Sequence, residues 1–215
     1  ILTLSPEYEG SAEFIRRVAE SGVIVSIGHT AASSDQIRAA VDAGARMSTH
    51  LGNGAHGQIR RHPNYIWDQL AEDRLVASLI ADGDHLPPAV FKYFVRAKTS
   101  ERCVLVSDIT GMAGMPPGRY EYPSLGAVEV LEDGRLVIPG QRQLLAGASL
   151  PLSVGIGNVM RMAGVDLETA IHMAAQGPAE LLGLPAARLR PGDTADLVLF
   201  DLPDSGMTGI EVSGE

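Results

Sequence analysis

Three apolar segments of the chain are each followed at once by a side chain that can bind a metal ion or carry a proton. They are residues 23–28, followed by His29; residues 45–49, followed by His50; and residues 104–107, followed by Asp108. A short apolar run rich in β-branched residues is typical of a buried strand in a parallel sheet. In such folds the ligands and catalytic groups lie beyond the carboxyl ends of the strands. The pattern therefore predicts a hydrolytic site built around a metal ion.

The spacing of the two histidines strengthens this prediction. His50 follows His29 by 21 residues, roughly the length of one strand–helix unit, so neighbouring strands would bring the imidazoles together. Neutral imidazoles are good ligands for Zn²⁺ and comparable ions. Asp108 could bind the ion weakly or accept a proton from a metal-bound water. Two alternatives stay open: a structural role for either histidine, and an N-cap role for Asp108.

Alternating strand and helix patterns place these residues in an α/β fold. Strands are predicted at residues 1–4, 23–27, 47–49, 75–80 and 104–106, and helices at 10–21, 33–43, 66–72 and 87–98. Short connections between such elements predict a parallel sheet with right-handed crossovers. Because the functional residues follow strands, the arrangement indicates part of a (β/α)8 barrel. A long loop rich in Gly, His and Arg, residues 51–66, interrupts the pattern.

The pattern changes after Asp108. We predict a β-hairpin insertion near 120–140, helices at 150–163, 166–175 and 179–182 with a break at 176–178, and a strand at 197–200. This gives an incomplete hydrolase barrel over residues 1–187, a strand of a small β domain over 188–202, and a C-terminal tail over 203–215. Because the chain starts inside an apolar run and without methionine, we expect it to be a fragment of a longer protein.

Composition excludes several classes of partner. The net charge of −9 and the isoelectric point near 5.1 argue against binding to nucleic acid or to an anionic membrane surface. No segment reaches the roughly 18 apolar residues that cross a bilayer. The single cysteine, Cys103, cannot form an internal disulfide, which favours a reducing compartment and a cytoplasmic location.

Eight short motifs, in order and at matching spacing, connect the chain with a known family. They lie at residues 4–7, 26–31, 48–53, 81–85, 105–109, 114–120, 145–149 and 191–198. Through them the chain resembles the N-acetylglucosamine-6-phosphate deacetylases of the amidohydrolase superfamily. The resemblance implies the C-terminal part of a (β/α)8 TIM-type barrel together with part of a small β domain.

The resemblance also implies an activity and a cofactor. His29 and His50 would ligate a divalent metal, with zinc favoured and iron, manganese or cobalt as alternatives. Asp108 would be the general base and acid that assists attack by metal-bound water. The reaction would convert N-acetylglucosamine 6-phosphate to glucosamine 6-phosphate and acetate, a step of amino-sugar metabolism.

Four further residues are assigned to the amino-sugar phosphate by the same resemblance. His85 would contact a hydroxyl or the phosphate, Asn53 and Gly54 would help to hold the phosphate, and Arg61 would reach it across a homodimer interface. The family's third metal ligand is a glutamate on an earlier strand, outside this chain, so we expect the isolated chain to be inactive or nearly so.

Residues 52–67 depart from the family pattern, and two other functions therefore stay open. One is hydrolysis of a different amide, cyclic or unphosphorylated. The other is a non-catalytic remnant or sugar-phosphate-binding module.

Overall fold

The centre of the fold is a five-stranded parallel sheet. The computed structural model describes residues 1–123, 126–185, 190–192, 198–201 and 211–212. The strands of the sheet are β1 (Leu2–Leu4), β2 (Val25–Ile27), β3 (Ala45–Ser48), β4 (Val76–Ile80) and β5 (Cys103–Val106). They lie side by side in chain order, and every pairing is parallel. The predicted alternating α/β architecture is confirmed.

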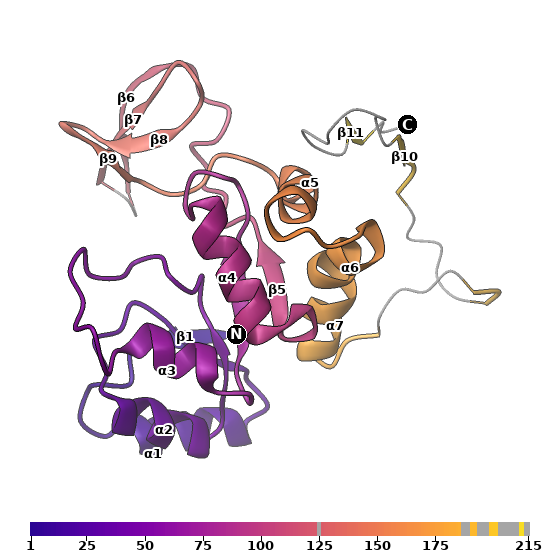
Figure 1. Cartoon of the computed structure of the whole chain (residues 1–215). Coiled ribbons are helices and arrows are strands. Elements are labelled where there is room, and N and C mark those ends of the chain that lie inside the picture. The colour runs from indigo at the N-terminus through magenta and orange to yellow at the C-terminus, as the bar shows by residue number, and fades with distance from the viewer. Residues whose placement is uncertain (124–125, 186–189, 193–197, 202–210, 213–215) are drawn as a thin grey trace.

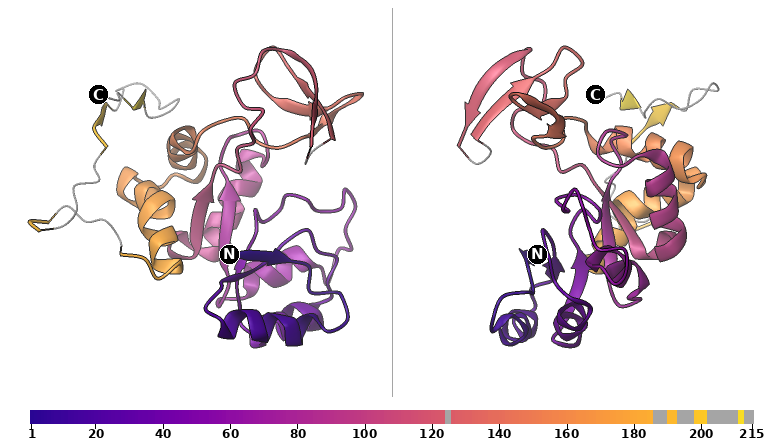
Figure 2. Two further views of the ribbon diagram at one scale, coloured as in Figure 1. Left: turned by 180° about the vertical axis from the view of Figure 1, so that it is seen from behind. Right: turned by 60° about the vertical axis from the view of Figure 1, so that its left-hand side comes forward.

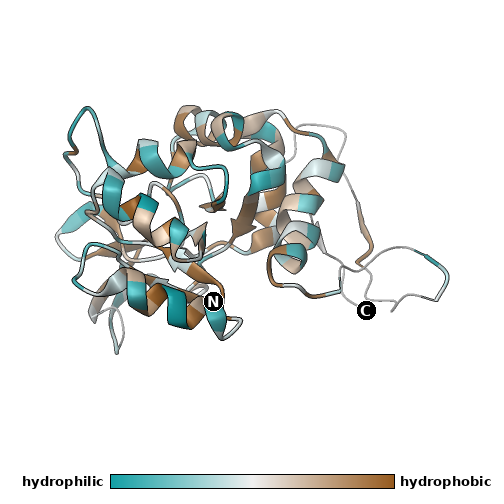
Figure 3. Cartoon of the chain, turned by 90° about the horizontal axis from the view of Figure 1, so that it is seen from below, coloured by the Kyte–Doolittle hydropathy of each residue, from teal (hydrophilic) through white to brown (hydrophobic). Residues whose placement is uncertain are grey.

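Four helices connect these strands and cover one face of the sheet. They are α1 (Ser11–Glu20), α2 (Ser34–Asp42), α3 (Tyr65–Ala71) and α4 (Pro88–Lys98). Each packs beside the next, and the row follows the order of the strands (Figures 1 and 2). The helices present hydrophilic residues to the outside, whereas the strands between them are largely hydrophobic (Figure 3). This is the layering expected for part of a (β/α)8 barrel.

Local sequence signals explain where these helices begin. Ser33 caps α2 through a capping box, in which its hydroxyl accepts from the Gln36 N–H and the Gln36 side chain accepts from the Ser33 N–H. Asn64 caps α3 by accepting from two backbone N–H groups. Pro88 occupies the first turn of α4, where its missing N–H costs nothing.

The insertion after β5 is larger than the predicted hairpin. It is a four-stranded antiparallel sheet of β6 (Gly118–Tyr122), β7 (Gly126–Val130), β8 (Leu136–Ile138) and β9 (Gln141–Leu145). The β7–β8 hairpin is present, but the prediction missed both outer strands, because β6 (GRYEY) and β9 (QRQLL) are short and largely polar. The sheet stands apart from the barrel strands (Figures 1 and 2). It has a small apolar core of its own, made by Met112, Val128, Val130 and Leu136.

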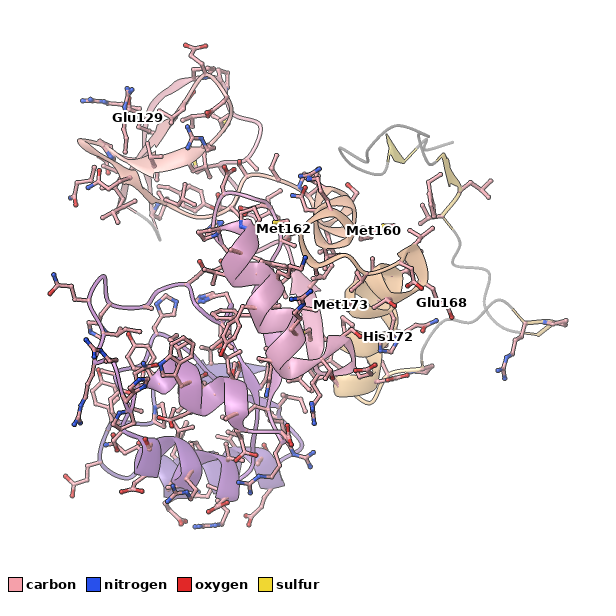
Figure 4. All side chains as sticks on the ribbon, in the orientation of Figure 1. Glu129, Met160, Met162, Glu168, His172 and Met173 are labelled. Carbon is pink, nitrogen blue, oxygen red and sulfur yellow. The ribbon has the colours of Figure 1, made fainter. Side chains whose placement is uncertain are left out.

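The helices that follow form a stack in which residues 167–181 are one uninterrupted helical run, with no break at residues 176–178. The segments are α5 (Leu152–Ala163), α6 (Leu167–Ile171), a π-helical turn (His172–Gln176) and α7 (Gly177–Leu181). Pro178 lies in the first turn of α7, directly after the π-helical turn. Because the hydrogen-bond pattern changes there, the missing N–H of Pro178 does not interrupt the helix. The predicted break is therefore wrong. Met162 and Met173 are buried where this stack closes on the sheet (Figure 4).

The C-terminal predictions are largely outside the described residues. Two short antiparallel strands, β10 (Phe200–Asp201) and β11 (Glu211–Val212), pair with each other. The predicted strand at 197–200 overlaps β10 only at Phe200, and β11 falls within the segment predicted as a tail. The boundary at residue 188 lies outside the described residues and stays a prediction. Within the described part of the chain, no helix combines the length and apolarity that crossing a bilayer requires.

One charged side chain lies in the core of the barrel. Lys98, at the end of α4, is fully buried, and its Nζ donates to the Glu72 carbonyl at 2.6 Å. Burial lowers the pKa of Lys98 from 10.5 to about 8. Burial also raises the pKa of the Cys103 thiol from 9.0 to about 12. Burial thus favours the neutral form of each group, and the Lys98 ammonium loses its proton above about pH 8.

This buried lysine makes folding stability depend on pH. Between about pH 8 and 10.5 the unfolded chain holds the Lys98 proton and the folded chain does not, so the free energy of unfolding gains a contribution that rises with pH. We expect Lys98→Met to remove that contribution, so that the stability of wild type relative to the variant increases across this window. Cys103 contributes a fall with pH, and the Lys98 charge lowers the Cys103 pKa, so both proteins are compared in a Cys103→Ala background.

Urea denaturation at pH 7, 8, 9 and 10 measures this effect. Lys92→Met, at a half-buried lysine on the same helix, is the matched control and should differ from wild type by a constant amount. A constant difference for Lys98→Met as well would contradict the prediction.

Candidate metal centre

His29 and His50 face each other at the carboxyl ends of two neighbouring strands. Ile27 pairs with Ser48 at the end of the β2–β3 ladder, so the two histidines leave the sheet at the same level. Their Nε2 atoms lie 2.8 Å apart, and the rings meet edge to face with centroids 4.6 Å apart. The predicted juxtaposition of the two imidazoles is confirmed.

All three residues singled out by the sequence have left-handed backbone conformations. The φ angles are 49° at His29, 29° at His50 and 50° at Asp108; among the described non-glycine residues only Thr99 also has positive φ. Such conformations cost on the order of 1–3 kcal/mol each and cluster at functional sites. The effect is to turn each side chain off its strand and over the end of the sheet.

Serine side chains from adjacent strands support the two histidine backbones. The Ser78 Oγ of β4 accepts from the His50 N–H at 2.7 Å and donates to the Ser48 carbonyl at 3.0 Å. The Ser5 Oγ lies 3.1 Å from the Gly28 carbonyl and 3.0 Å from the His29 carbonyl. Neither serine was predicted as a site residue, since a serine at a strand end carries no specific sequence signal.

Two glycines allow the chain to come close to the histidines. A Cβ atom on Gly28 would lie 2.8 Å from both Thr3 Cγ2 and Thr49 Cβ, and one on Gly54 would lie 2.6 Å from His29 Nδ1. Gly54 also has a φ of 62°. The loop after His50 therefore packs directly on the His29 ring, which any side chain at residue 54 would displace.

His85 is held by a buried carboxylate at the end of β4. Its Nδ1 lies 2.5 Å from Asp82 Oδ2, and Asp82 Oδ1 accepts from the backbone N–H groups of Asp84 and His85. Burial raises the pKa of Asp82, but the bonds from His85 and Asp84 outweigh it and leave this pKa below its usual value. Asp82 thus fixes the orientation of the His85 ring through the hydrogen bond to His85 Nδ1. Asp82 belongs to the motif at residues 81–85, but the sequence alone does not indicate this role.

Four of the predicted residues share one electrostatic neighbourhood. The pKa of His50 is lowered, mainly by burial; its own backbone opposes the shift, and the charges of His29 and His85 add to it while that of Asp108 opposes it. His50 is 8% exposed, so the neutral ring, which is the form that binds metal, is favoured.

Asp108 is exposed beyond β5, and no helix begins there. The alternative role of a helix cap is therefore not realised. Within the described part of the chain its carboxylate has no hydrogen-bond or ion-pair partner among protein groups, so the oxygens are available to a substrate or a water.

The remaining predicted residues lie in the loop after His50. Asn53 and Gly54 line a small cavity with His29, and Asn53 Nδ2 is buried without a partner. Arg61 does not line that cavity; its side chain is exposed, and its carbonyl accepts from Trp67 Nε1 at 3.2 Å. The structure thus groups Asn53 and Gly54 with the histidines and leaves Arg61 at the surface.

The imidazoles of His29 and His50 can supply two of the ligands that a divalent metal ion needs. Two imidazoles on one tetrahedral zinc, with bonds of about 2.0–2.1 Å, hold their nitrogens about 3.3 Å apart; the observed 2.8 Å is a hydrogen-bond distance, so the rings would separate slightly to share an ion. Among the described residues no group of three His, Cys, Asp or Glu side chains could hold an ion. In addition, the Nδ1 atom of His50 is buried and has no hydrogen-bond partner in the described part of the chain. Both findings fit a site that needs further groups.

Comparison with known proteins assigns the chain to a family. The amidohydrolase family profile matches residues 6–214. The chain is 37% identical over 203 residues to N-acetylgalactosamine-6-phosphate deacetylase of Escherichia coli O157:H7, covering 94% of this chain and 52% of that protein. It is 32% identical over 203 residues to N-acetylglucosamine-6-phosphate deacetylase of Lysinibacillus sphaericus, covering 93% of this chain and 51% of the relative.

Solved structures of the same kind of enzyme resemble the fold of this chain. N-acetyl-D-glucosamine-6-phosphate deacetylase of Mycobacterium smegmatis matches with a TM-score of 0.86 at 30% identity, over 98% of this chain and 55% of that one. The N-acetylglucosamine-6-phosphate deacetylase of Thermotoga maritima matches with a TM-score of 0.83 at 29% identity, over 93% of this chain and 54% of that one. The chain spans about half the length of these relatives. It belongs to the amidohydrolase family.

Proposed function

We propose that this chain is the metal-binding and proton-transferring half of a deacetylase for N-acetylated amino-sugar 6-phosphates. The observation that carries the proposal is the convergence of His29 and His50, joined Nε2 to Nε2 at 2.8 Å, with Asp108 in the same electrostatic neighbourhood. The relatives named above act on N-acetylglucosamine or N-acetylgalactosamine 6-phosphate by name, which supports the substrate class.

The residues divide the chemistry between them. His29 and His50 would hold a divalent ion, zinc in the first instance, which when bound polarises a carbonyl oxygen and lowers the pKa of a water. Asp108, with free carboxylate oxygens, would accept the proton of the attacking water and return it to the departing amine. His85, fixed at Nδ1 by Asp82, would present its other nitrogen to the sugar.

The proposal also covers recognition of the substrate phosphate and the formation of a homodimer. Asn53 and Gly54 adjoin His29 and would hold the phosphate, and Arg61, at the surface, would reach the phosphate of a second subunit in a homodimer. A planar guanidinium suits a phosphate through paired N–H donors. We place the protein in the cytoplasm, which its one cysteine, free and buried, supports.

Metal binding should depend on both histidines. We expect the chain to bind one Zn²⁺ or Co²⁺ ion, and His29→Ala or His50→Ala to weaken binding at least tenfold, because two protein ligands cannot compensate for the loss of one. Isothermal titration measures this, with the exposed loop histidine His62→Ala as the control. Equal affinity in wild type and both variants would refute the site.

Turnover should need a ligand from outside this chain. We expect the isolated chain to release no measurable acetate from N-acetylglucosamine 6-phosphate, and a chimera with the amino-terminal half of the Escherichia coli relative to be active. In that chimera Asp108→Asn should reduce kcat by about 10²–10⁴, the usual contribution of a general acid–base group. Full activity of the Asn variant would eliminate Asp108 as the proton carrier.

Phosphate recognition separates this function from hydrolysis of another amide. We expect the same chimera to prefer N-acetylglucosamine 6-phosphate to N-acetylglucosamine, and Arg61→Ala to raise KM for the phosphorylated sugar with little change in kcat. Arg60→Ala, at the adjacent exposed arginine, is the control. A preference for the unphosphorylated sugar would favour the other amide substrate.

A further inference from the structure

The segment directly after β1 makes contacts that the proposed chemistry does not use. Residues 4–7 form one of the motifs that link the chain with its family, and of them only Ser5 has so far been placed at the site. In the structure the Glu7 carboxylate reaches across to the loop that follows β2. Its Oε2 accepts from Thr30 Oγ1 at 2.5 Å, and its Oε1 accepts from the Ala31 N–H at 2.9 Å.

These bonds act on the residues immediately after His29. Thr30 is buried, and its Oγ1 also accepts from the Ala32 N–H at 3.0 Å. On the other side, Ser5 bonds the carbonyls of Gly28 and His29. The loop carrying His29 is therefore tied on both sides of that residue, by Ser5 at residues 28 and 29 and by Glu7 and Thr30 at residues 30–32.

His29 needs such support more than His50 does. Both backbones are left-handed, but the His29 residue is exposed and its strand β2 contributes only three residues to the sheet. His50 is buried, so packing restricts its ring. Hydrogen bonds that fix the flanking backbone therefore act with the Gly54 contact to hold this exposed imidazole in one orientation.

We propose that Glu7 is a positioning residue for His29, holding its imidazole where it meets the ring of His50. The inference rests on the proposed metal-binding role of the two histidines. Glu7 suits the task because both of its partners are donors and an ionised carboxylate only accepts. An amide in its place could keep the Ala31 bond through its oxygen, but its NH₂ group would then face Thr30 Oγ1, and the buried Thr30 hydroxyl would lose the acceptor for its own proton.

Metal affinity and the environment of the bound ion test the proposal. Glu7→Gln keeps the size of the side chain, and Glu9→Gln is the matched control, since Glu9 is exposed in the same loop and has no partner within the described residues. We expect Co²⁺ binding to the full 215-residue chain to weaken 10–100-fold in Glu7→Gln, the usual effect of losing an outer-shell partner, and to stay unchanged in Glu9→Gln.

Two further measurements separate positioning from a general loss of structure. Circular dichroism below the melting transition should be the same for all variants, whereas the paramagnetically shifted imidazole resonances of the Co²⁺-loaded protein should move only in Glu7→Gln. Thr30→Val, which removes one of the donors, should also weaken binding. If Glu7→Gln does not fold, Thr30→Val decides the question.

The outcomes distinguish this inference from the proposed function. Wild-type affinity and unshifted resonances in Glu7→Gln and Thr30→Val, with binding lost in His50→Ala, would overturn the role of Glu7 alone. A wild-type chain that binds no Co²⁺ would overturn the metal site and the role of Glu7 together.

Discussion

The site depends on one geometric constraint: the ends of parallel strands lie side by side, but side chains there reach a common point only if the backbone turns sharply. His29, His50 and Asp108 make that turn through left-handed conformations. At the two histidines the strain, on the order of 1–3 kcal/mol per residue, persists because side chains of neighbouring segments hold the backbone. Ser78 does so for His50, and Ser5 and Glu7 do so for His29.

Close packing follows from the same constraint. Gly28 and Gly54 lie where a Cβ atom would collide with a threonine or with the His29 ring. The loop after His50 can therefore press on the imidazole of the preceding strand. The two histidines are thus positioned by a network of short contacts that includes β1, β2, β3 and β4, and no single element determines their orientation.

The groups around the histidine pair keep the site receptive to a cation. Burial lowers the pKa of His50, so its ring is neutral and can donate a lone pair. Asp82 fixes His85 through one nitrogen, and Asp108 leaves its carboxylate free. The chain nevertheless provides two imidazoles and no third ligand among the described residues, in keeping with its span of about half its relatives' length.

The sequence by itself determined the parallel α/β order, the strand ends that carry the site and the family, because period, capping residues and motif order are local properties of the chain. It missed the outer strands β6 and β9 and predicted a break at residues 176–178, since short polar strands and a π-helical turn carry no local pattern that distinguishes them. Only the tertiary structure identified Ser5, Glu7, Ser78 and Asp82 as the groups that hold the site. Their partners lie on other strands or depend on the backbone path after a strand, so their role follows from contacts in space that residue type and spacing do not encode.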